Sequence, residues 1–229
     1  MFEYTTHPGK RVWASRSLAF IGSVLLRPFY KVRLEQAEAI VADGPVLMLP
    51  KHQSNLDIPL GYSALTKVTG RHAWCLIKSS LARPMFLGFF WKIGGIPVER
   101  ADPKLSKNLL IFARDVLYRR DLSGHQPGPG NVMVLFPEQH RLWKVMGEGK
   151  QAGFRFLVGK PEEPLVCYSV GYEYRSGFPR TELIVRVGPA RRFNAKTDPA
   201  LFLHERMIEI AELSGLSYDF PAPKARKGK

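Results

Sequence analysis

The sequence predicts one α/β domain with a mixed, largely parallel central sheet flanked by helices. Short apolar runs typical of buried strands alternate with stretches of helical spacing along most of the chain. The length of 229 residues suits one large domain. We find no internal repeat and no obvious linker. A helical segment that contacts a membrane is expected to precede the domain.

Residues 1–33 are predicted to form this basic, amphipathic, membrane-associating segment. They carry six lysines and arginines and one acid, with bulky apolar side chains between them. Such a helix can lie in a membrane interface with its cations on lipid phosphates, although a helix that covers a core can have the same pattern. The apolar run at 18–26 is too short to span a bilayer. Arg27-Pro28 follows it in place of a signal-peptide cleavage site, so we expect the segment to be retained.

The predicted domain covers residues 34–220, its basic residues are spread along the chain, and turn residues separate its elements. Val46 to Leu49 is a continuous apolar run that Pro50 ends, which is typical of a buried strand. Glycines and prolines fill residues 123–131 and predict a loop. The basic tail at 221–229 is expected to be disordered. In chain order we predict a strand at 46–49, a helix beginning at 54–57 and reaching 65, a strand at 73–77, a short helix within 81–91, a strand at 94–98, a helix at 105–119, strands at 132–136, 165–172 and 182–187, and a helix at 201–213.

Composition excludes several classes of protein. Hydrophobic residues make up 45% and charged residues 24% of the chain, which excludes a disordered or fibrous protein. Two cysteines, Cys75 and Cys167, make no disulfide framework and fit a reducing cytosol. The net charge of +14 predicts an anionic partner: nucleic acid, an acidic membrane or a phosphorylated small molecule. The chain shows no helix-turn-helix, zinc-finger or RNP motif, so nucleic acid is the less favoured partner.

A histidine and an aspartate, His52 and Asp57, form the most suggestive cluster. They lie between a predicted buried strand and a helix start, where α/β sheets place ligand sites. From the first helical turn, the Asp57 carboxylate can reach the imidazole, select its tautomer and raise its basicity. A structural alternative stays open, because Ser54 and Asp57 also match a capping box in which the aspartate only caps the backbone.

Two further clusters offer anion ligands. Phe136-Pro137-Glu138-Gln139-His140-Arg141 follows a predicted strand, and an arginine there can hold a phosphate. Gly94-Gly95 precedes a strand that leads to Arg100, a second candidate anion ligand. Each cluster could equally be a surface turn with exposed charges. No group of Cys and His residues has the spacing of metal ligands, so no metal is predicted.

In this order, His52-x4-Asp57, Gly94-x5-Arg100, Phe136-Pro137-Glu138-x-x-Arg141 and the strand at 164–166 resemble the four motif blocks of the glycerolipid acyltransferases, the family of bacterial 1-acyl-glycerol-3-phosphate acyltransferase. The similarity covers roughly residues 44–172. It implies that His52 is the general base and that Asp57 orients it. It also implies that Arg100, Glu138 and Arg141 bind the acceptor and that Gly94 shapes the second block.

The resemblance further implies an O-acyltransferase that moves a fatty acyl group from acyl-coenzyme A or acyl carrier protein to a lysolipid. The acceptor expected first is 1-acyl-glycerol-3-phosphate, which would give phosphatidic acid for phospholipid biosynthesis. Acyl transfer is direct and needs no cofactor, in agreement with the absence of a Gly-x-Ser-x-Gly elbow. The expected location is the cytoplasmic face of the cell membrane, as a peripheral or monotopic protein at an anionic surface.

The chain departs from the family pattern at three positions. Gln139 and His140 stand where the third block usually has Gly and Thr, and Lys51 replaces the commoner Asn before the histidine. Gly allows backbone conformations that Gln resists. These departures keep another lysophospholipid or a glycolipid open as the acceptor. An inactive membrane-surface module and a basic nucleic-acid-binding protein are the alternatives from other classes.

Overall fold

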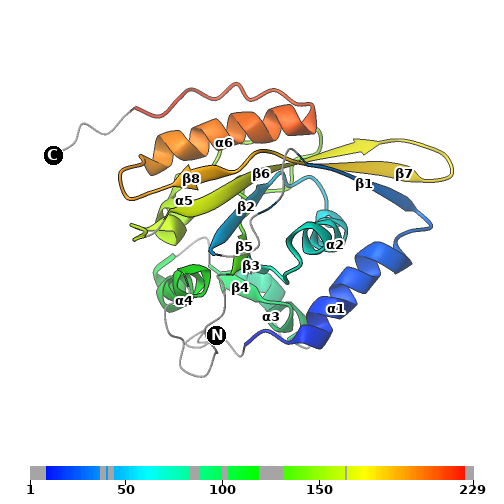
Figure 1. Ribbon diagram of the computed structural model, residues 1–229, viewed down its shortest axis with the longest axis horizontal. Helices are drawn as coiled ribbons and strands as arrows, with labels where there is room; N and C mark the ends of the chain where they lie inside the picture. Colours follow the sequence, from blue (N-terminus) through cyan, green and yellow to red (C-terminus); the bar gives the residue numbers. More distant parts are fainter. Residues whose placement is uncertain are drawn as a thin grey trace.

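The computed structural model describes residues 9–36, 40, 44–82, 88–99, 103–118, 131–162 and 164–224. In these residues an eight-stranded sheet is flanked by helices (Figure 1). The strands are β1 (Tyr30–Gln36), β2 (Val46–Pro50), β3 (Trp74–Lys78), β4 (Gly95–Val98), β5 (Val132–Val134), β6 (Leu165–Arg175), β7 (Thr181–Val187) and β8 (Arg191–Phe193). The helical elements are α1 (Val12–Phe20), η1 (Ile21–Leu25), α2 (Asp57–Thr69), η2 (Ser79–Ala82), α3 (Phe89–Lys92), η4 (Pro103–Ser106), α4 (Lys107–Tyr118), α5 (Gln151–Val158) and α6 (Pro199–Ser214).

The sheet is mixed but largely parallel, as predicted. Its strand order is β1-β7-β6-β2-β5-β3-β4, with β8 paired to β6. Strands β6, β2, β5, β3 and β4 run parallel to one another, and β7 and β8 pair antiparallel to β6. The carboxyl ends of the five parallel strands therefore lie along one edge of the sheet, where open α/β sheets place their ligands.

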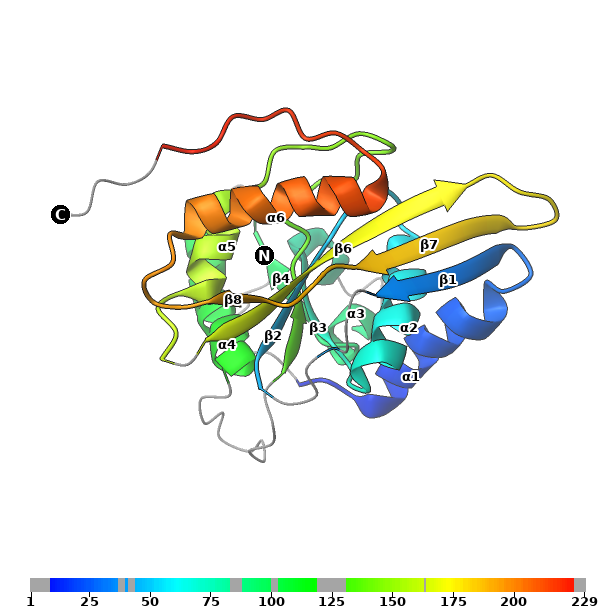
Figure 2. The same cartoon turned by 45° about the horizontal axis from the view of Figure 1, so that its top comes forward.

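The central strand β2 packs on both faces. Leu47 and Leu49 lie in a core with residues of α4, α5 and α6, whereas Val46 and Met48 lie in a second core with residues of α2. Because side chains alternate along a strand, β2 contributes to both cores and is fully buried. This explains why its sequence is a continuous apolar run. Figure 2 shows α6 lying over β6, away from α1 and α2.

Most predicted elements match the structure, with small shifts at their ends. The sequence did not indicate three elements: β1, α5 and β8. Charged residues occupy much of β1, which lies at the edge of the sheet, so it has no apolar run to mark it. The predicted short helix at 81–91 is divided between η2 and α3, and residues 83–87 lie outside the described part. So do residues 123–130 of the predicted loop.

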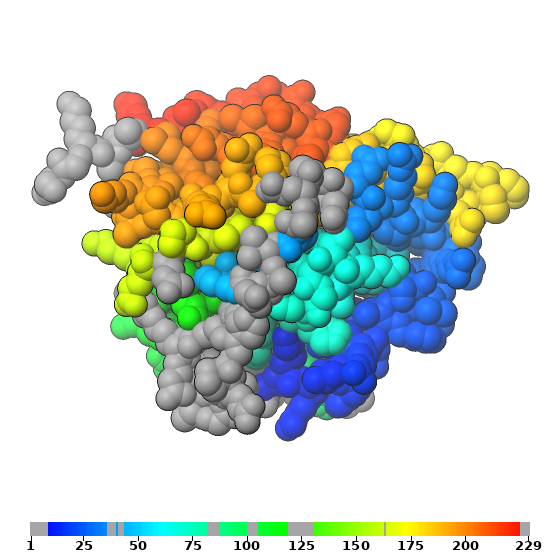
Figure 3. Space-filling view, in the orientation of Figure 1, coloured from blue at the N-terminus to red at the C-terminus, as the bar shows by residue number. Residues whose placement is uncertain are grey.

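The N-terminal segment is helical and lies beside α2 (Figure 3). It packs through small residues: Ala14 and Gly22 are buried, and a Cβ on Gly22 would come within 2.0 Å of the Pro59 carbonyl oxygen. Leu18 is buried as well, whereas other bulky apolar side chains, among them Trp13 and Phe20, are exposed. Strand β1 follows this segment. The boundary predicted between the N-terminal segment (1–33) and the domain (34–220) therefore lies inside β1.

No helix in the described residues has the length and hydrophobicity needed to cross a membrane. Of the predicted tail, residues 221–224 lie on the surface without regular secondary structure, and residues 225–229 are outside the described part.

Candidate active site

His52 lies in the loop between β2 and α2, at the edge of the sheet where the parallel strands end. Proline at position 50 ends the strand, and the next helix begins at Asp57. The Asp57 side chain is fully buried, while the His52 side chain keeps 13% of its surface exposed. The loop therefore presents an accessible imidazole against a buried carboxylate.

Asp57 accepts three hydrogen bonds on one oxygen. Its Oδ2 lies 3.0 Å from His52 Nδ1, 2.6 Å from the Gln53 amide nitrogen and 2.7 Å from the Ser54 amide nitrogen. The bond to Ser54 is the carboxylate half of the capping box. The reciprocal half is absent, because Ser54 Oγ accepts from the Leu56 amide at 3.2 Å. Asp57 thus holds the loop backbone and the imidazole with the same oxygen.

Tyr174, on β6, contacts the other oxygen of this carboxylate. Its hydroxyl donates to Asp57 Oδ1 at 2.6 Å. Burial, and then the nearby Asp57 charge, raise the pKa of Tyr174 far above its usual value, so the phenol stays protonated and remains a donor. The ring of Trp143 lies 5.2 Å from the Tyr174 ring. Tyr174 was not predicted from the sequence, since it is 117 residues from Asp57 and belongs to no local motif.

The contacts of His52 favour one tautomer. With Nδ1–H donated to Asp57, the lone pair is on Nε2, the atom that can accept a proton. Phe136 stacks on the imidazole at a centroid distance of 4.2 Å and restricts its orientation. Chemically, an imidazole oriented by a buried carboxylate in this way can act as a general base.

Glu138 lies beside the same loop but is fully engaged inside the protein. Its two carboxylate oxygens are each 2.8 Å from Lys51 Nζ, and Oε2 also accepts from the Gly147 amide at 2.7 Å. Both side chains of this ion pair are buried. Lys51 Nζ donates in addition to the Leu142 carbonyl at 3.1 Å. A buried lysine needs such a partner, and a lysine directly after the buried strand β2 is the sequence feature that indicates one.

The turn after β5 takes the backbone conformation that favours glycine. Gln139 has φ +59° and Lys144 has φ +55°. Gln139 therefore adopts the left-handed region even though it replaces glycine. Beyond it, His140 and Arg141 are exposed, and Arg141 Nη1 is hydrogen-bonded to Asn55 Oδ1. The Leu142 amide donates to the His52 carbonyl at 3.0 Å, so this turn and the histidine loop are joined.

The structure separates one predicted site residue from the others. Gly94 precedes β4 and lies at the amino end of that strand, whereas His52 follows the carboxyl end of the parallel strand β2. Gly94 forms a turn with φ +93°, and the Gly94 carbonyl accepts from the Cys75 amide at 3.0 Å. Gly94 therefore shapes the entry to β4 and not the surroundings of His52. Arg100 lies outside the described residues.

A model of the acyltransferase family matches residues 31–156, more than half of the chain. The chain belongs to the acyltransferase family. The match includes His52, Asp57, Glu138 and Arg141 and ends before Tyr174. Among curated proteins, none matches this acyltransferase at a significant level of sequence similarity.

The fold is similar to that of the 1-acyl-sn-glycerophosphate (LPA) acyltransferase PlsC from Thermotoga maritima, known from a crystal structure. The TM-score is 0.60 at 18% sequence identity, and the similarity covers 87% of this chain and 79% of that chain. This confirms the α/β fold predicted from the sequence, here in a member of the acyltransferase family.

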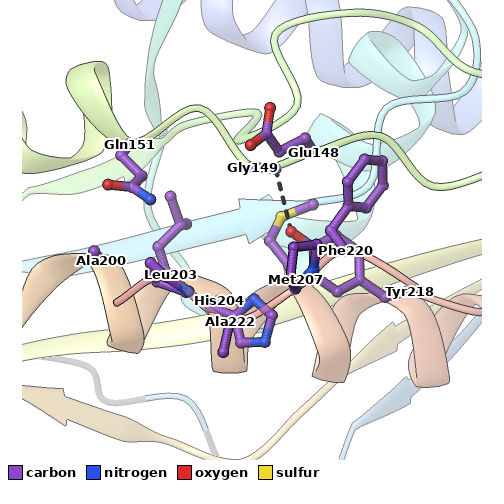
Figure 4. Close-up of a pocket in the computed structure, with 12 residues that line it drawn as sticks. Glu148, Gly149, Gln151, Ala200, Leu203, His204, Met207, Tyr218, Phe220 and Ala222 are labelled. Atoms are coloured by element: carbon purple, nitrogen blue, oxygen red, sulfur yellow. Dashed lines mark hydrogen bonds between the residues drawn. The ribbon is translucent and has the colours of Figure 1, made fainter. Parts of the chain in front are cut away.

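A cavity of about 230 Å³ lies away from His52, between α6, residues 148–151 and the C-terminal segment (Figure 4). Leu203, His204 and Met207 from α6 face Tyr218 and Phe220 across it. None of the residues proposed for the acyltransferase chemistry lines it. In the described part of the chain, no three His, Cys, Asp or Glu side chains are arranged to hold a metal ion.

Proposed function

We propose that this acyltransferase transfers a fatty acyl group from acyl-coenzyme A or acyl carrier protein to the free hydroxyl of 1-acyl-glycerol-3-phosphate, giving phosphatidic acid for phospholipid biosynthesis. The observation that carries the proposal is the pair of His52 Nδ1 and Asp57 Oδ2, 3.0 Å apart at the carboxyl edge of the sheet. It leaves Nε2 as the proton acceptor in a protein of this family.

The proposed reaction uses the imidazole twice. His52 Nε2 takes the proton of the acceptor hydroxyl as its oxygen attacks the thioester carbonyl carbon. The buried Asp57 carboxylate stabilises the imidazolium, and Tyr174 keeps this carboxylate in place. When the tetrahedral intermediate collapses, the C–S bond breaks and the imidazolium returns its proton to the leaving thiolate. General-base help contributes about 10²–10⁴-fold, and holding both substrates together contributes further through proximity.

The acceptor phosphate is assigned to the turn after β5. Arg141 and Lys144 are exposed there, and the hydrogen bond between Leu142 and His52 joins this turn to the base. An arginine can hold a phosphate through two parallel hydrogen bonds. We give Glu138 a positioning role in place of acceptor contact, since both its oxygens are occupied by Lys51 and Gly147.

A second acceptor class is favoured by Gln139 and His140, which stand where the family has Gly and Thr. The His140 side chain is exposed in this turn. A bulky, hydrogen-bonding ring at the proposed acceptor site suits a larger headgroup, as in another lysophospholipid or a glycolipid. The chemistry at His52 is the same for both acceptor classes.

We place the enzyme at the cytoplasmic face of the cell membrane as a peripheral or monotopic protein. Both lipid acceptor and lipid product are held in a bilayer. The net charge of +14 and the exposed aromatic side chains of the N-terminal segment suit an anionic lipid surface.

The test is acyl transfer by purified protein with labelled acyl-coenzyme A or acyl carrier protein and a panel of lysolipids. We expect product from lysophosphatidic acid, and none with the folded His52→Ala variant. His204→Ala is the matched control, because it removes an imidazole from α6 and should keep full activity. Product only from another lysolipid would move the function to the second acceptor class. Near-normal turnover by His52→Ala would refute the mechanism.

A further inference from the structure

The tip of the hairpin between β6 and β7 carries an aromatic side chain with no protein surface to cover it. Phe178 is fully exposed, and residues 175–180 around it are all exposed. Burying a phenylalanine side chain that is otherwise in water is favourable. One exposed phenylalanine is common on protein surfaces, so the residues beside Phe178 decide its significance.

The neighbouring part of the N-terminal segment also exposes bulky apolar side chains. Trp13, Phe20 and Leu25 are each more than half exposed, and Phe29, just before β1, is 65% exposed. In this segment Ala14, Gly22 and Leu18 are buried, whereas the other large side chains named above are exposed. A helix that only covered a core would expose fewer large apolar side chains.

The hairpin tip and this segment are joined by backbone hydrogen bonding. The Thr181 amide donates to the Phe29 carbonyl at 3.0 Å, and Arg180 Nη1 lies 3.5 Å from the Arg27 carbonyl oxygen. Figures 1 and 2 both show the β6–β7 turn and the start of β1 at the same end of the molecule. Phe178 and Phe29 therefore belong to one surface, although they are far apart in the sequence.

We propose that Phe178 at this hairpin tip is a second membrane-inserting element, which enters an anionic bilayer together with the exposed side chains of the N-terminal segment. This inference rests on the proposed function in one respect only, that the enzyme works at a lipid surface. We call these exposed side chains, Phe29 and Phe178 together with Trp13, Phe20 and Leu25 of the preceding helices, the apolar rim.

The charges around the apolar rim favour lipid over a second copy of the chain. Arg16, Arg27 and Arg180 are exposed among its aromatic side chains. A basic residue near an anionic membrane strengthens binding. In a two-fold dimer through the same surface, these arginines would approach their own copies, and like charges at an interface are costly.

The apolar rim is also connected to the active site. In strand β6, Val170 pairs with Pro50 of β2. Four residues further along the same strand, the Tyr174 hydroxyl donates to Asp57. Phe178 follows four residues after Tyr174. The strand that helps hold the catalytic carboxylate therefore continues directly to the proposed anchor, which would bring His52 close to the lipid surface that supplies the acceptor.

The test measures binding to phosphatidylcholine vesicles with and without phosphatidylglycerol. Phe178→Ser should lower the partition coefficient on the anionic vesicles about 10- to 100-fold, and Phe178→Trp should keep it, because tryptophan favours the membrane interface. Leu105→Ser is the matched control, since Leu105 is 56% exposed on η4, outside the apolar rim. It should leave binding unchanged. Arg180→Gln should lower binding to the anionic vesicles about fivefold.

Each outcome separates this proposal from the proposed function. Wild-type binding by Phe178→Ser would overturn the hairpin proposal and leave acyl transfer untouched. Loss of binding by Phe178→Ser, with normal turnover of a short-chain lysolipid dispersed in detergent, supports it. Absence of turnover by the wild type, with vesicle binding still dependent on Phe178, would remove the proposed function and keep the anchor. A lipid-free dimer that Phe178→Ser abolishes would assign the apolar rim to self-association and overturn the proposal.

Discussion

Replacing Lys51 by Met should destabilise the protein severely. Lys51 Nζ lies 2.8 Å from both oxygens of Glu138, and both side chains are buried. Methionine keeps much of the length of the side chain but removes the ammonium. Only the Gly147 amide, at 2.7 Å, then makes a short hydrogen bond to the carboxylate. Removing one partner of a buried ion pair costs about 3–5 kcal/mol. This is a large part of the total unfolding free energy of a protein domain, which is roughly 5–15 kcal/mol.

A double variant separates the ion pair from the packing around it. Lys51→Met with Glu138→Gln leaves no uncompensated charge, and the glutamine carbonyl can still accept from Gly147. We expect the double variant to be more stable than Lys51→Met alone by about 2 kcal/mol, because replacing both members of a buried pair is often close to neutral. The coupling follows from the four unfolding free energies of a double-mutant cycle.

The assay is urea unfolding followed by tryptophan fluorescence and circular dichroism, with linear extrapolation to water. Lys150→Met is the matched control: its ammonium lies 2.9 Å from Glu148 Oε2, but both side chains are about half exposed. An exposed pair of this kind contributes about 0.2–1 kcal/mol. A cost below about 1 kcal/mol for Lys51→Met, or additive losses in the double variant, would refute the reasoning.

Four further predictions concern the site and the N-terminal segment. Gln139→Gly should raise the unfolding free energy by about 0.5–1 kcal/mol, because relief of the left-handed φ outweighs the added chain entropy; an unchanged urea midpoint would contradict this. Tyr174→Phe should lower kcat about tenfold and move the acid limb of the pH–rate profile to higher pH, since Asp57 loses a donor and holds the imidazolium more strongly. A stability loss with an unmoved profile would make Tyr174 merely structural. Arg141→Ala should raise KM for a phosphorylated acceptor about tenfold with little change in kcat, and an unchanged KM would place the phosphate elsewhere. Burial lowers the pKa of Lys10 to about 8, so the folded protein binds fewer protons than the unfolded chain between that pH and about 10.5. The unfolding free energy of the wild type relative to Lys10→Met should therefore rise by up to about 3 kcal/mol across this range; parallel pH curves for the two proteins would contradict it.

The sequence alone determined the fold class and the local half of the site. Strand β2 and helix α2 follow from an apolar run, a proline and helical spacing, all of which act over a few residues. His52 and Asp57 are five residues apart across one strand-to-helix loop, so their contact needs only that loop to form. The family resemblance could be stated for the same reason, because its motifs are short and local.

Only the tertiary structure decided which distant residues complete the site. Tyr174 reaches Asp57 across 117 residues, and Glu138 reaches Lys51 across 87. Both contacts depend on β6 and β5 lying on either side of β2, an order that does not follow the chain. Gly94 lies at the opposite edge of the sheet from His52, because it precedes β4 and the length of that strand separates it from the carboxyl edge. Local patterns specify elements, whereas the pairing of strands far apart in the sequence depends on burying both faces of the sheet at once.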